Sequence, residues 1–212
     1  MAGEVVSKRD HERIRDAIRT RETRTSGEIF AVVARASDGY AYVAGFFAGF
    51  WAIALGLFML GGLWLLDFEV SALTVLLAQA AAYGSLLLLF AIFPAARMQV
   101  VPRSVSDLRA SRNAREQFLA HGIHETQGRT GVLLFVSLAE RYAEVIADTE
   151  VNAVVDQSVW DAAVAALVEG AANDDVAEGF LAAIEIVGDV LEAHFPPEEG
   201  GRSELDDHLV EL

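Results

Sequence analysis

Two long stretches without charge dominate the hydrophobic pattern of the chain. They cover residues 42–66 and 70–93, and the short segment Asp67, Phe68 and Glu69 separates them. A helix needs about 20 apolar residues to cross the hydrocarbon core of a bilayer, so each stretch is long enough. Two buried helices of a soluble protein are the alternative, but such helices seldom stay apolar on every face. The pattern therefore predicts a transmembrane helical hairpin.

Shorter periodic patterns lie on both sides of the hairpin. Residues 7–23 predict an amphipathic helix with Ser7 as its N-cap. Residues 28–34 form an apolar run of β type after a turn. Residues 104–121 predict a second helix, whose first residue is a serine suited to an N-cap, and Gly122 is expected to end it.

The remainder of the chain predicts two strands and two helices. Residues 131–137 are almost continuously apolar, as is typical of a strand buried on both faces. A tight turn leads to residues 142–148, the expected antiparallel partner of that strand. Residues 151–169 and 174–195 follow as helices, and Pro196 ends the second of them.

This order of elements predicts an α/β fold with a small mixed β-sheet flanked by helices. The two buried strands are expected to be parallel neighbours, joined by a right-handed crossover that contains the transmembrane hairpin. One domain is then split into residues 1–40 and 96–197, with the hairpin at residues 41–95 between them. Residues 198–212 form an acidic tail, in which we expect mostly disorder.

Composition and charge narrow the classes of function. There are no cysteines, which excludes disulfides, thiolate metal sites and cysteine nucleophiles. The formal net charge is −15, and of the 16 Lys and Arg residues only Arg141 and Arg202 lie beyond Arg129. Nucleic acid requires a basic face that neutralises phosphates, so the acidic last third argues against nucleic acid as a partner.

The flanks of the hairpin predict its orientation. Arg35 precedes the first span, Arg97 and Arg103 follow the second, and the loop carries Asp67 and Glu69. Positively charged flanks stay on the cytoplasmic side of a membrane. Both termini and the domain are therefore predicted to be cytoplasmic, with the lipid bilayer as the principal partner.

Small and polar residues within the spans predict how the two helices pack. Gly45 and Gly49 lie four residues apart on one face of the first helix and allow close approach. Gln79 is expected to make an interhelical hydrogen bond. The second helix offers small residues to the same contact: Ala78, Ala82 and Ser85.

Three separated segments carry a family resemblance. They are TSGEIFAVVA (residues 25–34), FLAHGIHETQGRTGVLLFVSLAERYAEVIAD (residues 118–148) and GFLAAIEIVGDVLEAHFP (residues 179–196). In this order they resemble the TPM domain family, which includes thylakoid lumen acid phosphatases, photosystem repair factors and a modulator of acetylcholine receptors. The resemblance implies a TPM-like fold and either metal-dependent phosphatase activity or non-catalytic binding to membrane protein partners during assembly or repair. Many members place the domain outside the cytoplasm, whereas the arginines of this chain predict the cytoplasmic side.

Three carboxylates are candidate ligands for calcium or magnesium. Glu28 begins the first strand, Asp148 ends the last predicted strand, and Glu150 follows it. Carboxylate oxygens are the ligands that these hard cations prefer, and the three side chains are expected near one rim of the sheet. The alternative is that Asp148 caps the helix that follows. The sequence contains no glycine-rich phosphate loop, and no catalytic residue is predicted.

Arg141 is a candidate anion-binding residue. It lies in the turn between the paired strands and is the only basic residue between Arg129 and Arg202. A surface salt bridge to an acidic neighbour is the alternative.

The acidic last two helices also suggest how the domain meets the membrane. Their carboxylates form a solvated face that an anionic leaflet repels. The basic first helix, with Arg13 and Arg19, is then expected to face the lipid headgroups.

Overall fold

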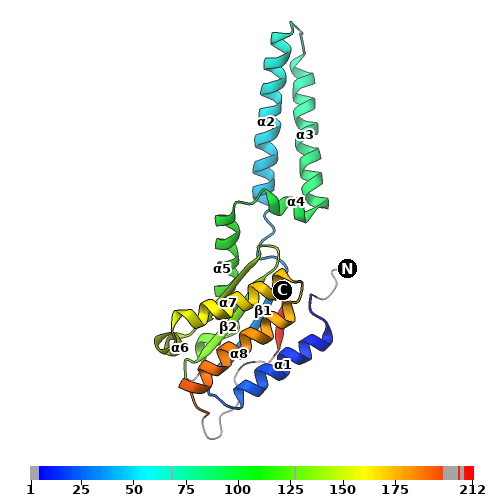
Figure 1. The fold of residues 1–212 in the computed structure, drawn as a ribbon. Coiled ribbons are helices and arrows are strands. Elements are labelled where there is room, and N and C mark those ends of the chain that lie inside the picture. Colours follow the sequence, from blue (N-terminus) through cyan, green and yellow to red (C-terminus); the bar gives the residue numbers. More distant parts are fainter. Residues whose placement is uncertain (1–4, 68, 127, 198–204, 206–207) are drawn as a thin grey trace. The chain divides into compact units, whose positions relative to one another are not determined.

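The computed structural model describes residues 5–67, 69–126, 128–197, 205 and 208–212 (Figure 1). It separates into two compact units. One unit comprises Met1–Ser37 and Asp107–Leu212, and the other comprises Asp38–Ser106. The first unit is built from two segments that the second interrupts in the sequence.

The first unit contains a four-stranded mixed sheet in the order β3-β2-β1-β4. Its strands are β1 (Glu28–Ala34), β2 (Gly131–Ser137), β3 (Tyr142–Ala147) and β4 (Leu209–Glu211). β1 runs parallel to both β2 and β4, whereas β3 pairs antiparallel with β2. The predicted mixed sheet with β1 and β2 as parallel neighbours is therefore confirmed.

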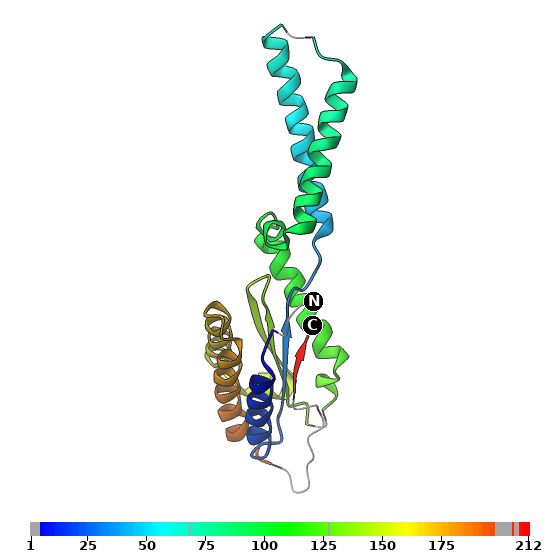
Figure 2. The ribbon, with the colours of Figure 1, turned by 90° about the vertical axis from the view of Figure 1, so that its right-hand side faces the viewer.

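Helices cover both faces of this sheet (Figure 2). On one face, α1 (Lys8–Glu22), α7 (Gln157–Ala172) and α8 (Val176–His194) pack over the larger core, which takes Ile29, Ala31 and Val33 from β1. On the other face, α5 (Arg103–Ala120) packs over the alternate residues of the same strand: Phe30, Val32 and Ala34. Both faces of β1 and β2 are buried, which explains why these strands are almost continuously apolar.

Local capping residues move two helix boundaries from their predicted places. α6 (Thr149–Val154) and α7 replace the single helix predicted over residues 151–169, because Asp156 accepts a hydrogen bond from the Ser158 N–H at 2.9 Å and begins α7. α5 begins at Arg103 directly after Pro102, so Ser104 lies inside the helix rather than capping it. Gly122 follows α5 with a φ of 66° and precedes a short 3-10 helix, Ile123–Glu125.

The expected disorder of the tail is wrong for the last residues of the chain. Residues 198–204 and 206–207 lie outside the described residues. Beyond them, Leu209–Glu211 forms β4 and pairs with Ala31–Val33 of β1. Leu209 is 2% exposed and belongs to the larger core. A three-residue strand is too short for an alternating pattern to reveal it, and the open edge of β1 supplies its hydrogen bonds.

The second unit is a helical hairpin followed by a short helix. It contains α2 (Ala41–Leu65), α3 (Ala72–Ile92) and α4 (Pro94–Gln99). Ser71 caps α3 by accepting a hydrogen bond from the Thr74 N–H at 3.2 Å. α2 and α3 are each long and apolar enough to cross a membrane.

Small residues of α2, among them the predicted Gly45 and Gly49, lie at its contact with α3. The buried stripe of α2 consists of Ala44, Ala48, Ala52 and Gly56. Gly45 and Gly49 lie one residue further on and face the ring of Tyr83. On α3, Ser85 is exposed, and the Gln79 side chain packs directly against Gly56. The predicted glycines therefore face α3, and a buried stripe of mainly alanines lies beside them on α2.

Candidate functional site

The predicted ligands Glu28 and Asp148 lie at the same end of the sheet. Glu28 pairs with Gly131 across the β1–β2 contact. On the other side of Gly131, the Asp148 N–H donates to the Gly131 carbonyl at 2.9 Å. Both side chains are buried, with 7% of Glu28 and 5% of Asp148 exposed. The sheet register therefore places two buried carboxylates on either side of one glycine.

Asp148 uses one carboxylate oxygen to cap α6. Its Oδ1 accepts hydrogen bonds from the Thr149 N–H at 2.6 Å and from the Thr149 hydroxyl at 3.2 Å. The Arg129 guanidinium lies 4.0 Å from the same oxygen. Its Oδ2 is buried and has no hydrogen-bond partner among the described residues. The capping alternative is thus realised, and the other carboxylate oxygen stays unsatisfied within the described part of the chain.

The other two predicted ligands, Glu28 and Glu150, differ in their surroundings. An oxygen of Glu28, Oε2, accepts a hydrogen bond from the Leu205 N–H at 3.4 Å. Glu150 lies in the first turn of α6 and is exposed, a position in which a negative charge favours the helix N-terminus. Within the described part of the chain, no three His, Asp or Glu side chains form a group that could hold a metal ion. The structure therefore does not gather Glu28, Asp148 and Glu150 into a three-ligand set.

A second polar cluster lies at the opposite end of the sheet, where β1 and β2 end. The Ser137 hydroxyl donates to Glu140 Oε2 at 2.5 Å, and the Ser37 N–H donates to Glu140 Oε1 at 2.9 Å. The two serine hydroxyls are 2.8 Å apart. Ser137 is 0% exposed and Glu140 is 1% exposed. The buried carboxylate thus ties together the two loops that follow the parallel strands.

This cluster extends onto α5. The side-chain amide of Asn113 donates to the Ser37 hydroxyl at 3.3 Å, and Gln117 donates to Asn113 at 3.1 Å. Sequence analysis missed the cluster, because its members come from three separate segments. The one local signal was the spacing Ser137-x-x-Glu140, which resembles the reciprocal pattern of a capping box.

Arg141 directly follows Glu140 of this cluster in the sequence. It is exposed and has a φ of 51° in the turn between β2 and β3, and its N–H donates to the Leu138 carbonyl at 3.1 Å. Glu140 turns inward at the same turn. Arg141 also makes an interaction of its own, so its role in anion binding stays a prediction.

Tyr142 adds a titratable hydroxyl near α5. Its hydroxyl donates to Glu144 at 2.9 Å. Burial is the main cause that raises the pKa of Tyr142; a hydrogen bond with Ser111 acts against the rise and the Glu144 carboxylate adds to it. The hydroxyl therefore stays protonated at neutral pH and acts as a hydrogen-bond donor.

Comparison with known proteins supports the fold and the family. Residues 96–190 match the model of the TPM domain. The fold is similar to the NMR structure of the BA42 protein from the psychrophilic bacterium Bizionia argentinensis, with a TM-score of 0.60 and 17% sequence identity over 100% of this chain and 99% of that chain. No curated protein matches the chain.

The matched segment begins after the hairpin, whereas the sheet also takes β1 from before it. In the sequence, the inserted unit Asp38–Ser106 separates β1 from the remainder of the domain. The register of β1 against β2 is nevertheless continuous over seven residue pairs. The chain therefore contains a TPM domain, as the three resembling segments predicted.

Proposed function

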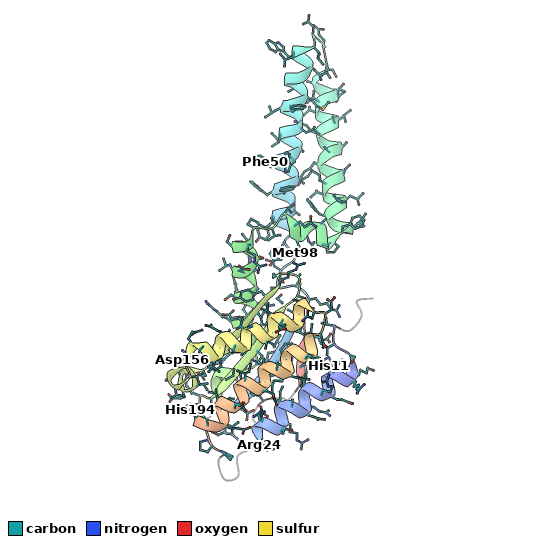
Figure 3. All side chains as sticks on the ribbon, in the orientation of Figure 1. His11, Arg24, Phe50, Met98, Asp156 and His194 are labelled. Atoms are coloured by element: carbon teal, nitrogen blue, oxygen red, sulfur yellow. The ribbon has the colours of Figure 1, made fainter. Side chains whose placement is uncertain are left out.

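We propose that this protein is a two-span membrane protein that holds a TPM domain at the cytoplasmic face of a bilayer. The observation that carries the proposal is the outward surface of α2 and α3. Large apolar side chains cover it, and several are more than three-quarters exposed: Phe46, Phe58, Trp64 and Leu65. In Figure 3, Phe50 likewise points outward from α2.

This surface suits lipid rather than water. In the most apolar windows of α2 and α3, only 22% and 11% of the residues are buried, whereas a core helix of a soluble protein is mostly buried. Monomeric soluble proteins seldom expose continuous apolar patches beyond a few hundred Å². The helices also satisfy their own backbone hydrogen bonds, which the bilayer interior requires.

Sidedness follows from the flanking charges. Arg35 precedes α2, and Arg97 and Arg103 follow α3, while the connecting loop carries Asp67 and Glu69. The positive-inside bias supports a cytoplasmic domain and an external loop.

Single-cysteine labelling tests both parts of this proposal, because the chain has no cysteine of its own. We expect a membrane-impermeant maleimide to label Glu69→Cys in intact cells, and to label Asp161→Cys on α7 only after the membrane is permeabilised. The protein should also resist extraction from membranes by alkaline carbonate. Labelling of Asp161→Cys in intact cells would reverse the orientation, and extraction by carbonate would reject the membrane anchor.

For the domain itself, the buried edge next to Gly131 supports binding of calcium or magnesium. Buried polar atoms are nearly always paired, so the unpartnered Oδ2 of Asp148 calls for a partner. A divalent cation held by Asp148 and Glu28 would satisfy it through oxygen ligands. Such a cation supplies Lewis-acid activation of a phosphate ester when bound, which makes metal-dependent phosphatase activity the candidate chemistry.

The cation proposal is tested by thermal unfolding with calcium or magnesium added. Asp148→Asn keeps the oxygen that caps α6 and removes the charge. Asp156→Asn makes the same change at the exposed cap of α7, where the hydrogen bonds of Ser158 lower the pKa of the carboxyl, and serves as the matched control. We expect the cation to raise the melting temperature of the wild type and of Asp156→Asn but not of Asp148→Asn.

Hydrolysis of a phosphomonoester by the same three proteins tests the chemistry. Activity that requires the cation and is lost in Asp148→Asn supports the phosphatase. No cation-dependent stabilisation and no hydrolysis would reject it. The second candidate, a non-catalytic module that binds membrane protein partners, would then take its place.

A further inference from the structure

The charges of the TPM domain are distributed unequally between the two faces of its sheet. On one face, α7 and α8 carry no Lys or Arg, and six carboxylates project from them: Asp161, Glu169, Glu178, Glu185, Asp189 and Glu192. On the other face, α5 carries four arginines against two acidic residues. The face that α5 covers is therefore the more basic one.

The basic helix α1 lies on the acidic face of the sheet, because ion pairs attach it to α8. Arg13 pairs with Glu178, and Arg21 pairs with Asp189 at 2.6 Å and with Glu192 at 2.9 Å. These ion pairs fix α1 on the acidic face of the domain. The ion pair with Glu178 thus holds Arg13 against α8, whereas the sequence analysis expected it to face lipid headgroups.

The outward face of α5 combines two arginines with two large apolar side chains. Leu108, Arg112, Arg115 and Leu119 follow one another at helical spacing, so they share a face opposite the buried Ala110 and Ala114. Leu108 is 70% exposed and Leu119 is 58% exposed. Arg112 pairs with Glu116 at 2.8 Å, but both side chains are more than half exposed, so water and salt weaken this pair.

We propose that this face of α5 lies on the bilayer and binds anionic lipid headgroups, with Leu108 and Leu119 inserted among the acyl chains. The proposal rests on the membrane anchor proposed above. Helices with basic and apolar residues on one face bind anionic membrane interfaces in this way. The chain also keeps α5 near the bilayer, since only α4 and residues 100–102 follow Phe93 before α5 begins.

The charges of the domain favour this side over the opposite one. An anionic leaflet attracts the arginines of α5 and repels the carboxylates of α7 and α8. Because Leu108 and Leu119 lie three turns apart, about 16 Å along the helix axis, both reach the membrane only if α5 lies flat on it.

Environment-sensitive fluorophores on single cysteines test the proposal in the full-length protein. The protein is reconstituted in vesicles of phosphatidylcholine alone or with added phosphatidylglycerol. Probes at Leu108→Cys and Leu119→Cys report on α5, and a probe at Val168→Cys on α7 is the matched control, since Val168 is 45% exposed on the acidic face. A probe at Ile53→Cys reports on the hairpin itself.

With phosphatidylglycerol present, we expect both α5 probes to shift to the blue, to be quenched by brominated lipid and to lose quenching by aqueous iodide. The Arg112→Gln, Arg115→Gln double variant should return them to water, and high salt should weaken the effect. The probe at Val168 should stay in water throughout.

Three outcomes would overturn the proposal. In the first, both α5 probes remain in water while the Ile53 probe is in lipid. In the second, the Leu119 probe alone remains in water. In the third, both α5 probes are shielded from iodide without quenching by brominated lipid, which would indicate a protein partner. An Ile53 probe in water would instead reject the membrane anchor, so the two failures are distinguishable.

Discussion

Two pairs of consecutive helices in this protein pack through small residues, yet they differ on their outward faces. α2 and α3 meet along a stripe of alanines that ends in Gly56. α7 and α8 meet where Gly170 and Gly179 approach each other, and a Cβ atom on Gly170 would lie 2.5 Å from the Gly179 Cα. Small residues at a helix contact therefore do not distinguish α2 and α3, the proposed membrane pair, from α7 and α8.

The outward faces make the distinction. α2 and α3 carry no charged residue, and their large exposed side chains are aromatic and aliphatic. α7 and α8 carry acidic side chains, three of which bind Arg21 of α1. The surface that faces away from the contact is the one that meets the surrounding medium, so its apolar character supports the proposed membrane environment of α2 and α3.

The largest expected effect is a steric clash at the contact between α7 and α8. Gly170→Val places side-chain atoms against the backbone of Gly179 and against the Asp175 carbonyl, neither of which can move like a side chain. We expect a loss of about 4 kcal/mol in the free energy of unfolding of the domain. Chemical denaturation measures it.

Gly84→Val in α3 is the control for this substitution. No atom lies within 4 Å of the position that its Cβ would occupy, so the stability of the hairpin should not change. Equal losses for the two variants would mean that the α7–α8 contact is no tighter than the open face of α3.

The next effect comes from a charge placed on each outward face. Ile53 lies near the middle of α2 and is 60% exposed, whereas Val168 on α7 is 45% exposed. Arginine at the centre of a membrane helix costs about 3 kcal/mol, so Ile53→Arg should strongly reduce the inserted fraction in a microsome insertion assay. Val168→Arg should change the unfolding free energy by about 0.5 kcal/mol or less. Unchanged insertion of Ile53→Arg would remove the difference between the two pairs.

Burial explains which elements of the fold the sequence predicts. β1 and β2 have both faces covered, and the hairpin lacks charge over two complete helices, so both give long apolar patterns. β4 gives no such pattern, since it has only three residues and forms by pairing with the edge of β1. Gly45 and Gly49 of α2 were predicted to face α3 and do so, whereas the buried alanine stripe beside them was not predicted.

The candidate site depends on pairings that a linear pattern does not contain. Glu28 and Asp148 were predicted to share one rim because strand ends are visible in the sequence. Whether Asp148 Oδ2 finds a partner among the described residues depends on which oxygen caps α6, and the Ser37–Ser137 contact joins residues 100 positions apart. Such contacts follow from sheet register and side-chain rotamers, which single-sequence periodicity does not specify.

A smaller effect on stability is expected at the contact between α2 and α3. Gly56→Ala would overlap the Gln79 side-chain amide, but Gln79 is flexible and can turn aside. We expect destabilisation of the α2–α3 contact by about 1.5 kcal/mol, the lower part of the range for overpacking. Combining it with Gln79→Ala should restore most of the loss, as a double-mutant cycle in detergent unfolding would measure. Additive losses would show that Gln79 does not fill the space beside Gly56.

The ionic contacts of α8 give a smaller effect again. Arg21 is 15% exposed, and its stem crosses Gly188, where a Cβ would lie 2.7 Å from the Arg21 Cδ. Arg21→Met keeps the apolar stem and removes the charge, so we expect a loss of about 1 kcal/mol in unfolding free energy. Arg24→Met is the control: Arg24 is 60% exposed and 4.0 Å from Glu192, and its loss should be undetectable. Matching losses would show that the charge network of Arg21 adds nothing.

The smallest effect concerns the other attachment of α1, at Glu211 of β4, and it depends on pH. Glu211 accepts hydrogen bonds from the amides of Val5 and Val6 at 3.1 and 2.9 Å and lies 3.0 Å from His11. Burial acts to raise the pKa of Glu211, but these bonds outweigh it and lower the pKa below its ordinary value of 4.5. A carboxyl whose pKa is lower in the folded state stabilises the fold above its unfolded-state pKa, and this contribution disappears as the pH falls through the folded-state pKa. The difference in unfolding free energy between wild type and Glu211→Gln should therefore be present at neutral pH and vanish as the pH falls below the folded-state pKa of Glu211. A difference that stays constant as the pH falls would assign the role of Glu211 to packing. Arg13 and Arg21 would then supply the charged contacts that distinguish α1 and α8 from α2 and α3.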